Sequence, residues 1–410
     1  MTSGASAIPP GLAGVRLLAD EPLAAGQRWI FSAGFNVADG PGGLGRVDTE
    51  LADLARLSGA GARVALLTHQ GRHADGSARH LGDLATYLGG RLGGPVRYLP
   101  WSTGPEARAA AAALRDGEIA LFGNTRLHAG EERNDPDLAV EFAALGERVA
   151  MGGFSKAHRR HASTTGLLGL LPGWAADSLV RELTLLGPWA GRDPTRFSVA
   201  VVGGRKQEKV EVGLRRLGSA YDLVIPGGAV LNCLLAARGH PVAESVLGDS
   251  PARAVEVAAE VLAAAAPDAL HLPEEVAVAR PDGSGGYGEA RWLRLDPRRP
   301  DDGVPPGYAV VDFTVLPWAL AALDRLVGGG GRAVVAGPPS AYRAGHRRAS
   351  DQVLTRLAGA RDDVVLLGGD TVAELPWSGP TSTGGGSALR YLAEGGCAVL
   401  DALRDDDDGR

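Results

Sequence analysis

The sequence predicts an α/β protein with two Rossmann-like, three-layer domains whose sheets are mainly parallel, joined by a hinge helix. Short apolar runs typical of buried strands alternate with helical stretches, which is the pattern of parallel sheets. These runs end beside Gly, Asn or His, and ligands of parallel sheets bind at the carboxyl ends of the strands. The length of 410 residues also exceeds the usual size of one hydrophobic core, so we expect two domains.

The predicted strands are short apolar runs rich in Val, Ile, Leu and Ala. They cover residues 63–68, 118–122, 197–202, 222–225, 333–335 and 364–367. Helices are expected at 105–114, 176–185 and 250–265, and polar loops rich in Gly and Pro at 281–288 and 296–306. Gly and Pro gather after the second of these helices, which is therefore predicted to be the hinge.

The domain boundaries follow from this order of elements. Residues 1–185 are predicted to form an N-terminal domain with a basic cleft, and residues 186–385 a C-terminal domain. The last segment, 386–410, is expected to pack back on the first domain. Its four consecutive aspartates at 405–408 are expected to form a solvated, disordered tail.

Composition excludes several classes of protein. The formal net charge of −6 argues against a general nucleic-acid binder. Only two cysteines occur, each among apolar residues, so a disulfide framework or a cysteine metal site is not expected. No apolar run approaches the length of a membrane span, and residues 1–12 lack the features of a signal peptide. We therefore expect a cytoplasmic protein with no membrane partner.

Histidines and arginines gather in the first half where the predicted strands end. One group follows 63–68, a second follows 118–122, and a third is a dense cluster: His69 and Arg72; Asn124, Arg126 and His128; His158, Arg159, Arg160 and His161. Any one of these could be a surface arginine or a histidine bonded inside the fold. Together they favour a cleft for a small polyanion, because arginine binds phosphate and carboxylate in a bidentate manner.

Glycines follow the predicted strands of the second half. Gly203 and Gly204 precede Lys206, a pattern that lets backbone N–H groups and a mobile cation meet phosphate but that also occurs in ordinary turns. Gly368 and Gly369 precede Asp370, whose carboxylate can hold Mg²⁺ on a nucleotide or cap a helix. The standard P-loop is absent, and no dinucleotide fingerprint stands out.

Several motifs, in order, resemble those of the phosphoglycerate kinase family. That family has Arg-Val-Asp-Phe-Asn, Ser-His-Leu-Gly-Arg, Glu-Asn-x-Arg-(Phe/Tyr)-His followed by acidic residues, and Ala-His-Arg-Ala-His. The chain has Ser32-Ala-Gly-Phe-Asn36, Thr68-His-Gln-Gly-Arg72, Gly123-Asn-Thr-Arg-Leu-His128 followed by Glu131 and Glu132, and Ala157-His-Arg-Arg-His161. Ser382-Thr-Gly-Gly-Gly386 matches the family's second glycine loop. The resemblance runs from about residue 29 to residue 400 and implies the two-domain phosphoglycerate kinase fold.

The resemblance also implies roles for single residues. Those implied to bind the acid substrate are Asn36 at its carboxylate end and His69, Arg72, Arg126 and Arg159 at its phosphate, with His158 and His161 close by. Those implied to bind the nucleotide are Gly203, Gly204, Lys206, Lys209, Gly227, Gly228, Gly337, Pro338, Gly368, Gly369, Asp370 and Thr371. Asp370 would hold the metal ion. Arg46, Lys206, Gly368 and Gly369 would surround the transferring phosphoryl group as the catalytic set.

The chain departs from the family pattern at several positions. Gly34 stands where the family has the aspartate that faces the hydroxyl of glycerate, and Ser32 replaces that aspartate's arginine partner. Met151-Gly-Gly-Phe-Ser-Lys156 replaces Asn-Asp-Ala-Phe-Gly-Thr, which removes an acid and adds a lysine. In the second half, Ala336 replaces an asparagine near the phosphates and Arg343 replaces the ribose-contacting glutamate.

The resemblance implies an ATP-dependent carboxylate kinase that uses Mg²⁺ and makes an acyl phosphate. The departures in the first half favour a small phosphate- or phosphonate-bearing acid that is more acidic than 3-phosphoglycerate or lacks its hydroxyl. Two alternatives remain open: an ordinary glycolytic 3-phosphoglycerate kinase, and a non-catalytic homologue that binds a nucleotide or metabolite. A monomer with ATP or ADP and the acid as its only partners is expected.

Overall fold

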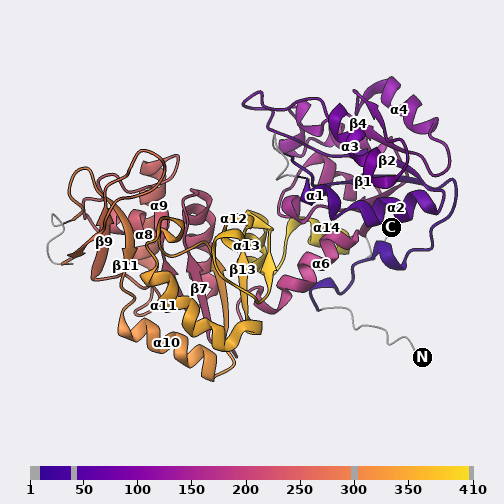
Figure 1. Ribbon diagram of the computed structural model, residues 1–410. Coiled ribbons are helices and arrows are strands. Elements are labelled where there is room, and N and C mark those ends of the chain that lie inside the picture. Colours follow the sequence, from indigo (N-terminus) through magenta and orange to yellow (C-terminus); the bar gives the residue numbers. More distant parts are fainter. Residues whose placement is uncertain (1–9, 38–43, 297–302, 406–410) are drawn as a thin grey trace. The chain divides into compact units, whose positions relative to one another are not determined.

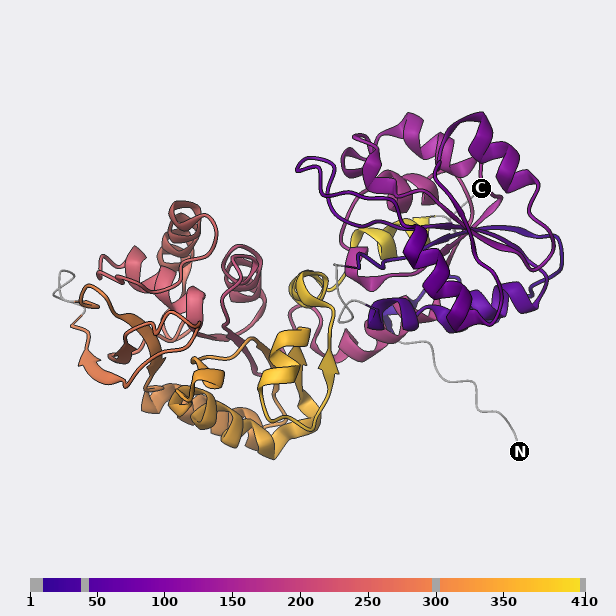
Figure 2. The same cartoon turned by 45° about the horizontal axis from the view of Figure 1, so that its top comes forward.

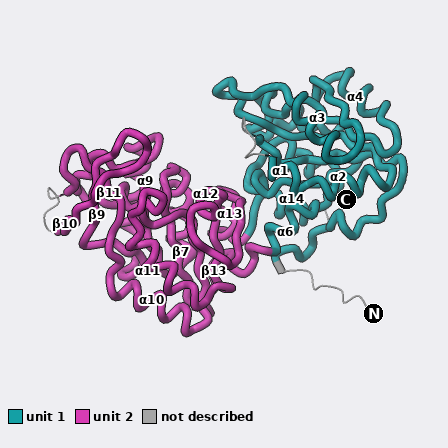
Figure 3. The backbone as a smooth tube through the Cα atoms, viewed as in Figure 1, with its two compact units in different colours: residues 1–184, 396–410 teal, residues 185–395 magenta. Residues whose placement is uncertain are grey.

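The computed structural model describes residues 10–37, 44–296 and 303–405 of the chain (Figure 1). Of the predicted acidic tail at 405–408, Asp405 belongs to the last helix, and residues 406–408 lie outside the described residues, as does part of the predicted loop at 296–306. The chain forms two compact units, one of Met1–Thr184 with Gly396–Arg410 and one of Leu185–Gly395 (Figure 3). Each unit is an α/β structure, which confirms the predicted fold class.

The first unit is built on a parallel sheet of six strands in the order β3-β4-β2-β1-β5-β6. The strands are β1 (Arg28–Ser32), β2 (Arg63–Leu67), β3 (Arg97–Leu99), β4 (Ile119–Phe122), β5 (Arg148–Met151) and β6 (Gly173–Ala175). The helices are α1 (Gly45–Asp48), α2 (Leu51–Gly59), α3 (Gly82–Leu92), α4 (Gly104–Ala112), α5 (Pro136–Ala143), α6 (Asp177–Leu186) and α14 (Ala398–Asp405). Helices cover both faces of this sheet (Figure 2).

The central strands read as unbroken apolar runs because they are buried on both faces. Alternate residues of β1 point to opposite sides of the sheet. Trp29 and Phe31 pack in one core with Leu54 of α2 and Leu88 of α3. Ile30, also fully buried, lies outside that core, as expected for a residue on the opposite face.

The second unit has a five-stranded parallel sheet in the order β14-β13-β12-β7-β8 and a separate antiparallel sheet in the order β10-β9-β11. Its strands are β7 (Ser198–Val202), β8 (Leu223–Pro226), β9 (Glu275–Ala279), β10 (Arg291–Arg294), β11 (Ala309–Phe313), β12 (Arg332–Ala336), β13 (Val364–Leu367) and β14 (Thr381–Ser382). Its helices are α7 (Gly218–Ala220), α8 (Gly228–Ala237), α9 (Pro251–Ala264), α10 (Pro317–Gly328), α11 (Arg348–Leu357), α12 (Gly369–Glu374) and α13 (Gly385–Glu394). The nine residues of Lys209–Leu217 form a π-helix.

The second unit extends past the expected boundary at residue 385. Helix α13 buries Leu389 and Leu392 and packs on β13 and on the π-helix, so it belongs to this unit. Helix α14, by contrast, packs on β6 of the first unit and buries Leu400 and Leu403. The chain therefore returns to the first unit at Gly396.

None of the helices in the described part of the chain has the length and apolar character that a bilayer span requires.

Candidate active site

The carboxyl ends of β4, β2, β1 and β5 lie side by side at one edge of the first sheet, because these strands are neighbours and run parallel. Each predicted group of polar residues follows one of these ends. Asn36 comes after β1, His69 after β2, Arg126 after β4, and His158 to His161 after β5. The topology thus gathers the predicted substrate residues of these four loops at a single edge.

Asn124 and Asn36 join the loops to one another. The fully buried amide of Asn124 accepts hydrogen bonds from the N–H groups of Gln70 (3.2 Å) and Arg126 (3.0 Å). The Asn36 N–H donates to the carbonyl of His69 (3.0 Å), and its side-chain oxygen accepts from Gly71 N–H (3.3 Å). Asn36 has φ of +37°, a conformation that asparagine tolerates better than most residues. The amide of Asn36 therefore supports the β2 loop from the side of β1.

Arg126 is an almost fully buried arginine, 1% exposed. One terminal nitrogen of its guanidinium pairs with Glu132. Its Nε and its other terminal nitrogen have no hydrogen-bond partner, although both are buried. A buried donor without an acceptor costs free energy, so native proteins rarely keep one without a reason. Two such donors on one planar group are suited to a bidentate anion.

His69 and His161 lie beside this guanidinium as uncharged imidazoles. Burial, and then the charges of Arg126 and Lys156, hold the pKa of His69 well below 6.5. Burial, and then Arg126 and Arg159, lower the pKa of His161 to about 3. Both rings are therefore neutral at physiological pH and can each donate one N–H without adding charge.

The remaining predicted acid-site residues are more accessible. His158 and Arg159 are half-buried, with Arg159 Nε 3.4 Å from His158 Nε2. Arg72 is exposed, and its backbone N–H donates to Ser77 Oγ (2.9 Å). Arg46 is exposed on the short helix α1. Long, exposed cations of this kind can reach a ligand above the buried groups.

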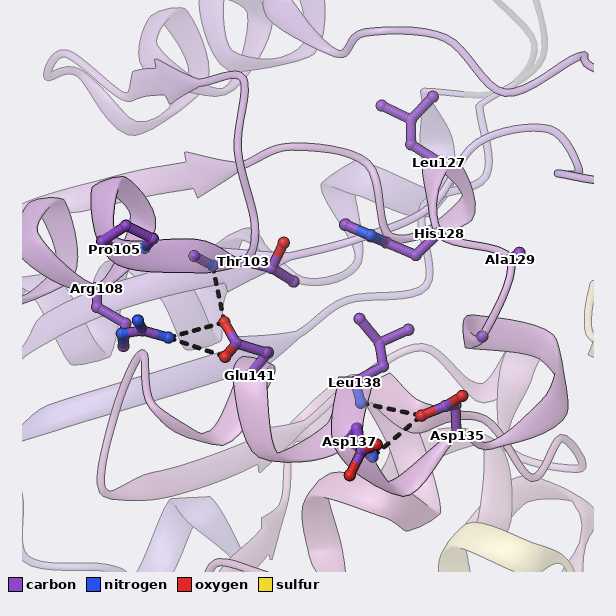
Figure 4. Close-up of a pocket in the computed structure, with 12 residues that line it drawn as sticks. Thr103, Pro105, Arg108, Leu127, His128, Ala129, Asp135, Asp137, Leu138 and Glu141 are labelled. Atoms are coloured by element: carbon purple, nitrogen blue, oxygen red, sulfur yellow. Dashed lines mark hydrogen bonds and ion pairs between the residues drawn. The ribbon is translucent and has the colours of Figure 1, made fainter.

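His128, which follows β4 in the sequence, does not join this group. Its Nε2 lies 2.8 Å from Ser102 Oγ, and it lines a surface pocket of about 680 Å³ near the N-termini of α4 and α5 (Figure 4). In that pocket Glu141 accepts from Gly104 N–H (2.7 Å) and pairs with Arg108 (2.8 Å). The sequence also places Asp135 there as the N-cap of α5. The charged groups of this pocket are thus bonded to other groups of the protein, and the pocket is not suited to bind a polyanion.

A chain of buried hydrogen bonds under the site was not predicted from the sequence. The Lys156 ammonium donates to Ser32 Oγ, and Ser32 Oγ donates to the carbonyl of Ser163 (2.6 Å). Ser163 Oγ donates to the buried carboxylate of Glu131 (2.5 Å), whose Oε1 lies 3.9 Å from His161 Nδ1. The chain of bonds therefore links the ends of β1 and β5 to an imidazole of the site.

Glu50 is a second buried acid that the sequence motifs did not indicate. Its Oε1 accepts from Gly34 N–H (3.2 Å), and its Oε2 is buried without a partner. Burial raises the pKa of this carboxyl, while the nearby Lys156 charge lowers it. Glu50 lies in the turn between two helices, far from every recognised motif, so only the fold brings it to β1.

In the second unit, glycines let three loops approach one another closely. Added side-chain carbons at Gly203 and Gly337 would collide with each other's loop, and one at Gly228 would collide with Gly204. Gly337 also has φ of +116°, which few other residues adopt. The ends of β7, β8 and β12 are thus brought together by backbone contacts that only glycine allows.

Lys206 and Asp370 form the charged part of this second candidate site. Lys206 Nζ lies 2.8 Å from Asp370 Oδ2, and both side chains are largely exposed. This lysine lowers the pKa of Asp370. Lys209 is buried beside them, and burial lowers its pKa to about 8. Gly368, with φ of +98°, and Gly369 lead directly into helix α12, whose Thr371 is buried.

These residues fit a magnesium ion carried by a nucleotide. No group of three or more His, Cys, Asp or Glu side chains in the described part of the chain could hold a metal alone. Mg²⁺ commonly uses one or two carboxylates together with substrate phosphates, and Asp370 offers one exposed carboxylate. The nearby Arg343 pairs with Glu374. The backbone N–H of Arg343 donates to Glu374 Oε1 (3.2 Å), and Arg343 Nε lies 3.8 Å from Glu374 Oε2.

Comparisons with known proteins agree on one family. The sequence model described as phosphoglycerate kinase matches residues 36–405. The phosphoglycerate kinase of Rhodospirillum centenum is 34% identical over 357 residues, which cover 85% of this chain and 88% of that protein. The phosphoglycerate kinase of Rhizobium leguminosarum is 34% identical over 379 residues, 88% of this chain and 91% of that protein. The solved phosphoglycerate kinase of Coxiella burnetii, 24% identical, covers 96% of this chain and 100% of its own with a TM-score of 0.70.

Proposed function

Because this chain belongs to the phosphoglycerate kinase family, we propose that it transfers the γ-phosphoryl group of Mg-ATP to the carboxylate of a small acid bearing a phosphate or phosphonate. The family is a phosphotransferase family with a carboxyl group as acceptor. The observation that supports the acid site most directly is Arg126, whose buried guanidinium keeps two donors unpaired and lowers the pKa of His69 and His161. A phosphate or phosphonate dianion would satisfy both donors.

The chemistry needs little from the protein beyond position and charge. A carboxylate is ionised at neutral pH, so no general base is required. One carboxylate oxygen attacks the γ-phosphorus in line, the bond to the β,γ-bridging oxygen breaks, and the electron pair leaves with ADP. Arg46, Lys206 and the backbone at Gly368 and Gly369 are proposed to stabilise the charge on the transferring group. Mg²⁺, when bound with the nucleotide, neutralises phosphate charge, and Asp370 is the residue that would hold it.

The identity of the acid substrate can be proposed more specifically. Gly34 leaves no carboxylate where the family pattern has its aspartate, which favours an acid without a hydroxyl on the carbon beside its carboxylate. The relatives named phosphoglycerate kinase favour 3-phosphoglycerate itself. A non-catalytic binder is the least supported reading, because Arg46, Lys206 and Asp370 are all present.

Mg²⁺-dependent ATP consumption tests the proposal. The assay supplies 3-phosphoglycerate and, separately, its 2-deoxy analogue 3-phosphonooxypropanoate, with hydroxylamine to trap an acyl phosphate as the hydroxamate. Hydroxamate formed in proportion to ADP with either acid supports the proposed kinase. ADP formation without hydroxamate, or no turnover with either acid or with phosphonate analogues in protein that binds Mg-ATP, would contradict it.

Arg46→Ala tests the proposed catalytic arginine. An arginine that acts mainly on the transition state lowers kcat much more than it raises the KM for the acid. We expect a loss of kcat of at least 100-fold, measured by initial rates. Unchanged turnover would show that another cation has this role.

A further inference from the structure

Glu208 is a charged residue of the second unit that the proposed function does not use. It lies between Lys206 and Lys209 in the segment that follows β7. The strands of the five-stranded sheet run parallel, so the segments after β7, β13 and β14 leave the sheet at the same edge. Helix α13 begins in the segment after β14 and packs on the π-helix that begins at Lys209. The sheet therefore brings Glu208 close to the N-terminus of α13.

The carboxylate of Glu208 lies directly against Gly386, the second residue of α13. A carbon added to Gly386 would overlap Glu208 Oε1 and lie 2.5 Å from Glu208 Cδ and 3.1 Å from Glu208 Oε2, and these are its three nearest atoms. The N-cap residue, Gly384, has no side chain that could accept a hydrogen bond from the first turn. The N-terminus of a helix carries partial positive charge and favours an anion. In this protein, the anion next to the N-terminus of α13 is the carboxylate of Glu208.

Lys209 is a buried cation beside this carboxylate. It is 8% exposed, and its ammonium forms no ion pair within 4 Å in the described part of the chain. Burial lowers the pKa of Lys209 to about 8, and the charge of Glu208 raises it. A buried ammonium without a direct partner costs free energy. Lys209 therefore indicates that an anion other than a carboxylate of the protein binds next to it.

Two lysines and two acids meet at this edge of the sheet, and together they carry no net charge. Lys206 pairs with Asp370, and both residues act on the pKa of Lys209, as Glu208 does. The charge of Asp370 has a proposed use, because this carboxylate would hold the metal ion that comes with a nucleotide. The charge of Glu208 has no such use, and it repels a phosphate group. A phosphate that binds Lys209 and the N-terminus of α13 must therefore displace the carboxylate of Glu208.

We propose that Glu208 is a built-in competitor of the nucleotide phosphates. Its carboxylate occupies the anion position between Lys209 and the N-terminus of α13, and it moves away when a phosphate group of the nucleotide binds there. The Glu208 side chain is exposed, so it can rotate without a change in the backbone. Such a competitor weakens the apparent affinity for nucleotide by the fraction of molecules in which the position is free. This inference rests on the proposed function, because it concerns the proposed nucleotide site.

Titration calorimetry with ADP and with adenosine, which lacks the phosphates, tests the inference in the absence of Mg²⁺. At pH 6.5 Lys209 stays protonated, even though the loss of Glu208 lowers its pKa further below about 8. In Glu208→Gln the Kd for ADP should fall about three- to tenfold, and the Kd for adenosine should stay the same. The control is Glu211→Gln, which removes the same charge from the π-helix, where Glu211 Oε1 accepts from Gln207 Nε2 (2.6 Å); it should change neither Kd. An unchanged or higher Kd for ADP in Glu208→Gln, or an equal fall in Glu211→Gln, would overturn the inference.

Glu208→Asp separates the position of the carboxylate from its charge, and it keeps the test usable if Glu208→Gln folds poorly. The aspartate keeps a negative charge beside Lys209, but its side chain is one methylene shorter and cannot lie against Gly386 in the same way. If the carboxylate competes by occupying the anion position, Glu208→Asp also binds ADP more tightly than the wild type. If Glu208→Asp binds ADP with the wild-type Kd, occupation of the anion position is refuted.

These binding measurements use neither the acid substrate nor turnover, so they separate the inference from the proposed kinase activity. If no acid is phosphorylated but Glu208→Gln binds ADP more tightly, the kinase proposal fails and the inference holds. If an acid is phosphorylated and the Kd for ADP is the same in both proteins, the kinase proposal holds and the inference fails. Absence of ADP binding in both proteins would contradict both.

Discussion

Replacing Gly34 with alanine should destabilise the first unit, because no space exists for even one carbon. The added carbon would lie 2.5 Å from Gly153 Cα and 3.1 Å from both the Gly153 carbonyl carbon and Ser155 Oγ. Two of these atoms are backbone atoms next to paired strands, since Ser32 of β1 is in register with Met151 of β5. Overpacking of this kind typically costs about 1–3 kcal/mol. For a unit of this size that corresponds to a fall in Tm of roughly 2–12 °C.

Scanning calorimetry should compare the Tm of Gly34→Ala with that of Gly59→Ala, which is the control. Gly59 ends helix α2, and a carbon added there meets no atom within 4 Å. Gly59→Ala should be neutral or stabilising by up to about 1 kcal/mol. The steric argument also predicts that Gly34→Asp, which restores the family's residue, gains no activity with 3-phosphoglycerate. A Gly34→Ala protein as stable as Gly59→Ala would refute the reasoning.

Four further predictions concern charge and hydrogen bonding. Arg126→Met should raise the KM for the acid at least 100-fold in steady-state kinetics and leave the KM for ATP unchanged, because the two unpaired donors are proposed to bind the acid. Asp370→Asn should raise the Mg²⁺ concentration needed for half-maximal activity about tenfold in a magnesium titration, with no change in thermal stability, since its side chain is exposed. Arg332→Met should lower the free energy of unfolding in urea by about 2–4 kcal/mol, because this buried guanidinium donates to three carbonyls of residues 188–191. The His161 imidazole should show no protonation step from pH 5.5 to 7.5 in an NMR titration, because a pKa of about 3 leaves it neutral throughout; a step in that range would show a charged histidine.

The sequence predicts the strands that carry the sites better than it predicts the contacts beneath them. The predicted strand at 63–68 is β2 (Arg63–Leu67), and the one at 364–367 is β13 (Val364–Leu367). Both are central, so their apolar runs are unbroken and easy to recognise. The antiparallel strands β9 to β11 were not predicted. Strand β10 carries arginine at both ends and is largely exposed, so it lacks the apolar pattern on which the prediction depends. Strands β9 and β11 are mostly apolar and buried, so the sequence did carry a signal for them.

The residues under the acid site illustrate what a sequence alone does not reveal. Ser32, Ser163 and Glu131 are common residue types whose importance comes from hydrogen bonds between distant segments. Glu50 looks like a surface residue at the end of a helix, yet it is 1% exposed. A visible signal did exist at Lys156, because a lysine was added next to a motif that otherwise uses arginine and histidine. Its partners could be found only from the fold.

The proposed acid site buries two of its acids, Glu50 and Glu131, whereas Glu132, which pairs with Arg126, is partly exposed. The two buried carboxyls compensate Lys156, and that of Glu131 also accepts hydrogen bonds from Ser163. Arginine keeps its charge at every physiological pH, and the buried His69 and His161 add none, so neither of these two histidines changes the attraction for an anion. Lys156 is the one buried cation of this site whose charge can change, because burial lowers its pKa from 10.5. A neutral Lys156 would leave the buried Glu50 carboxylate without its main compensating charge, because Lys156 is the cation that most lowers the pKa of Glu50.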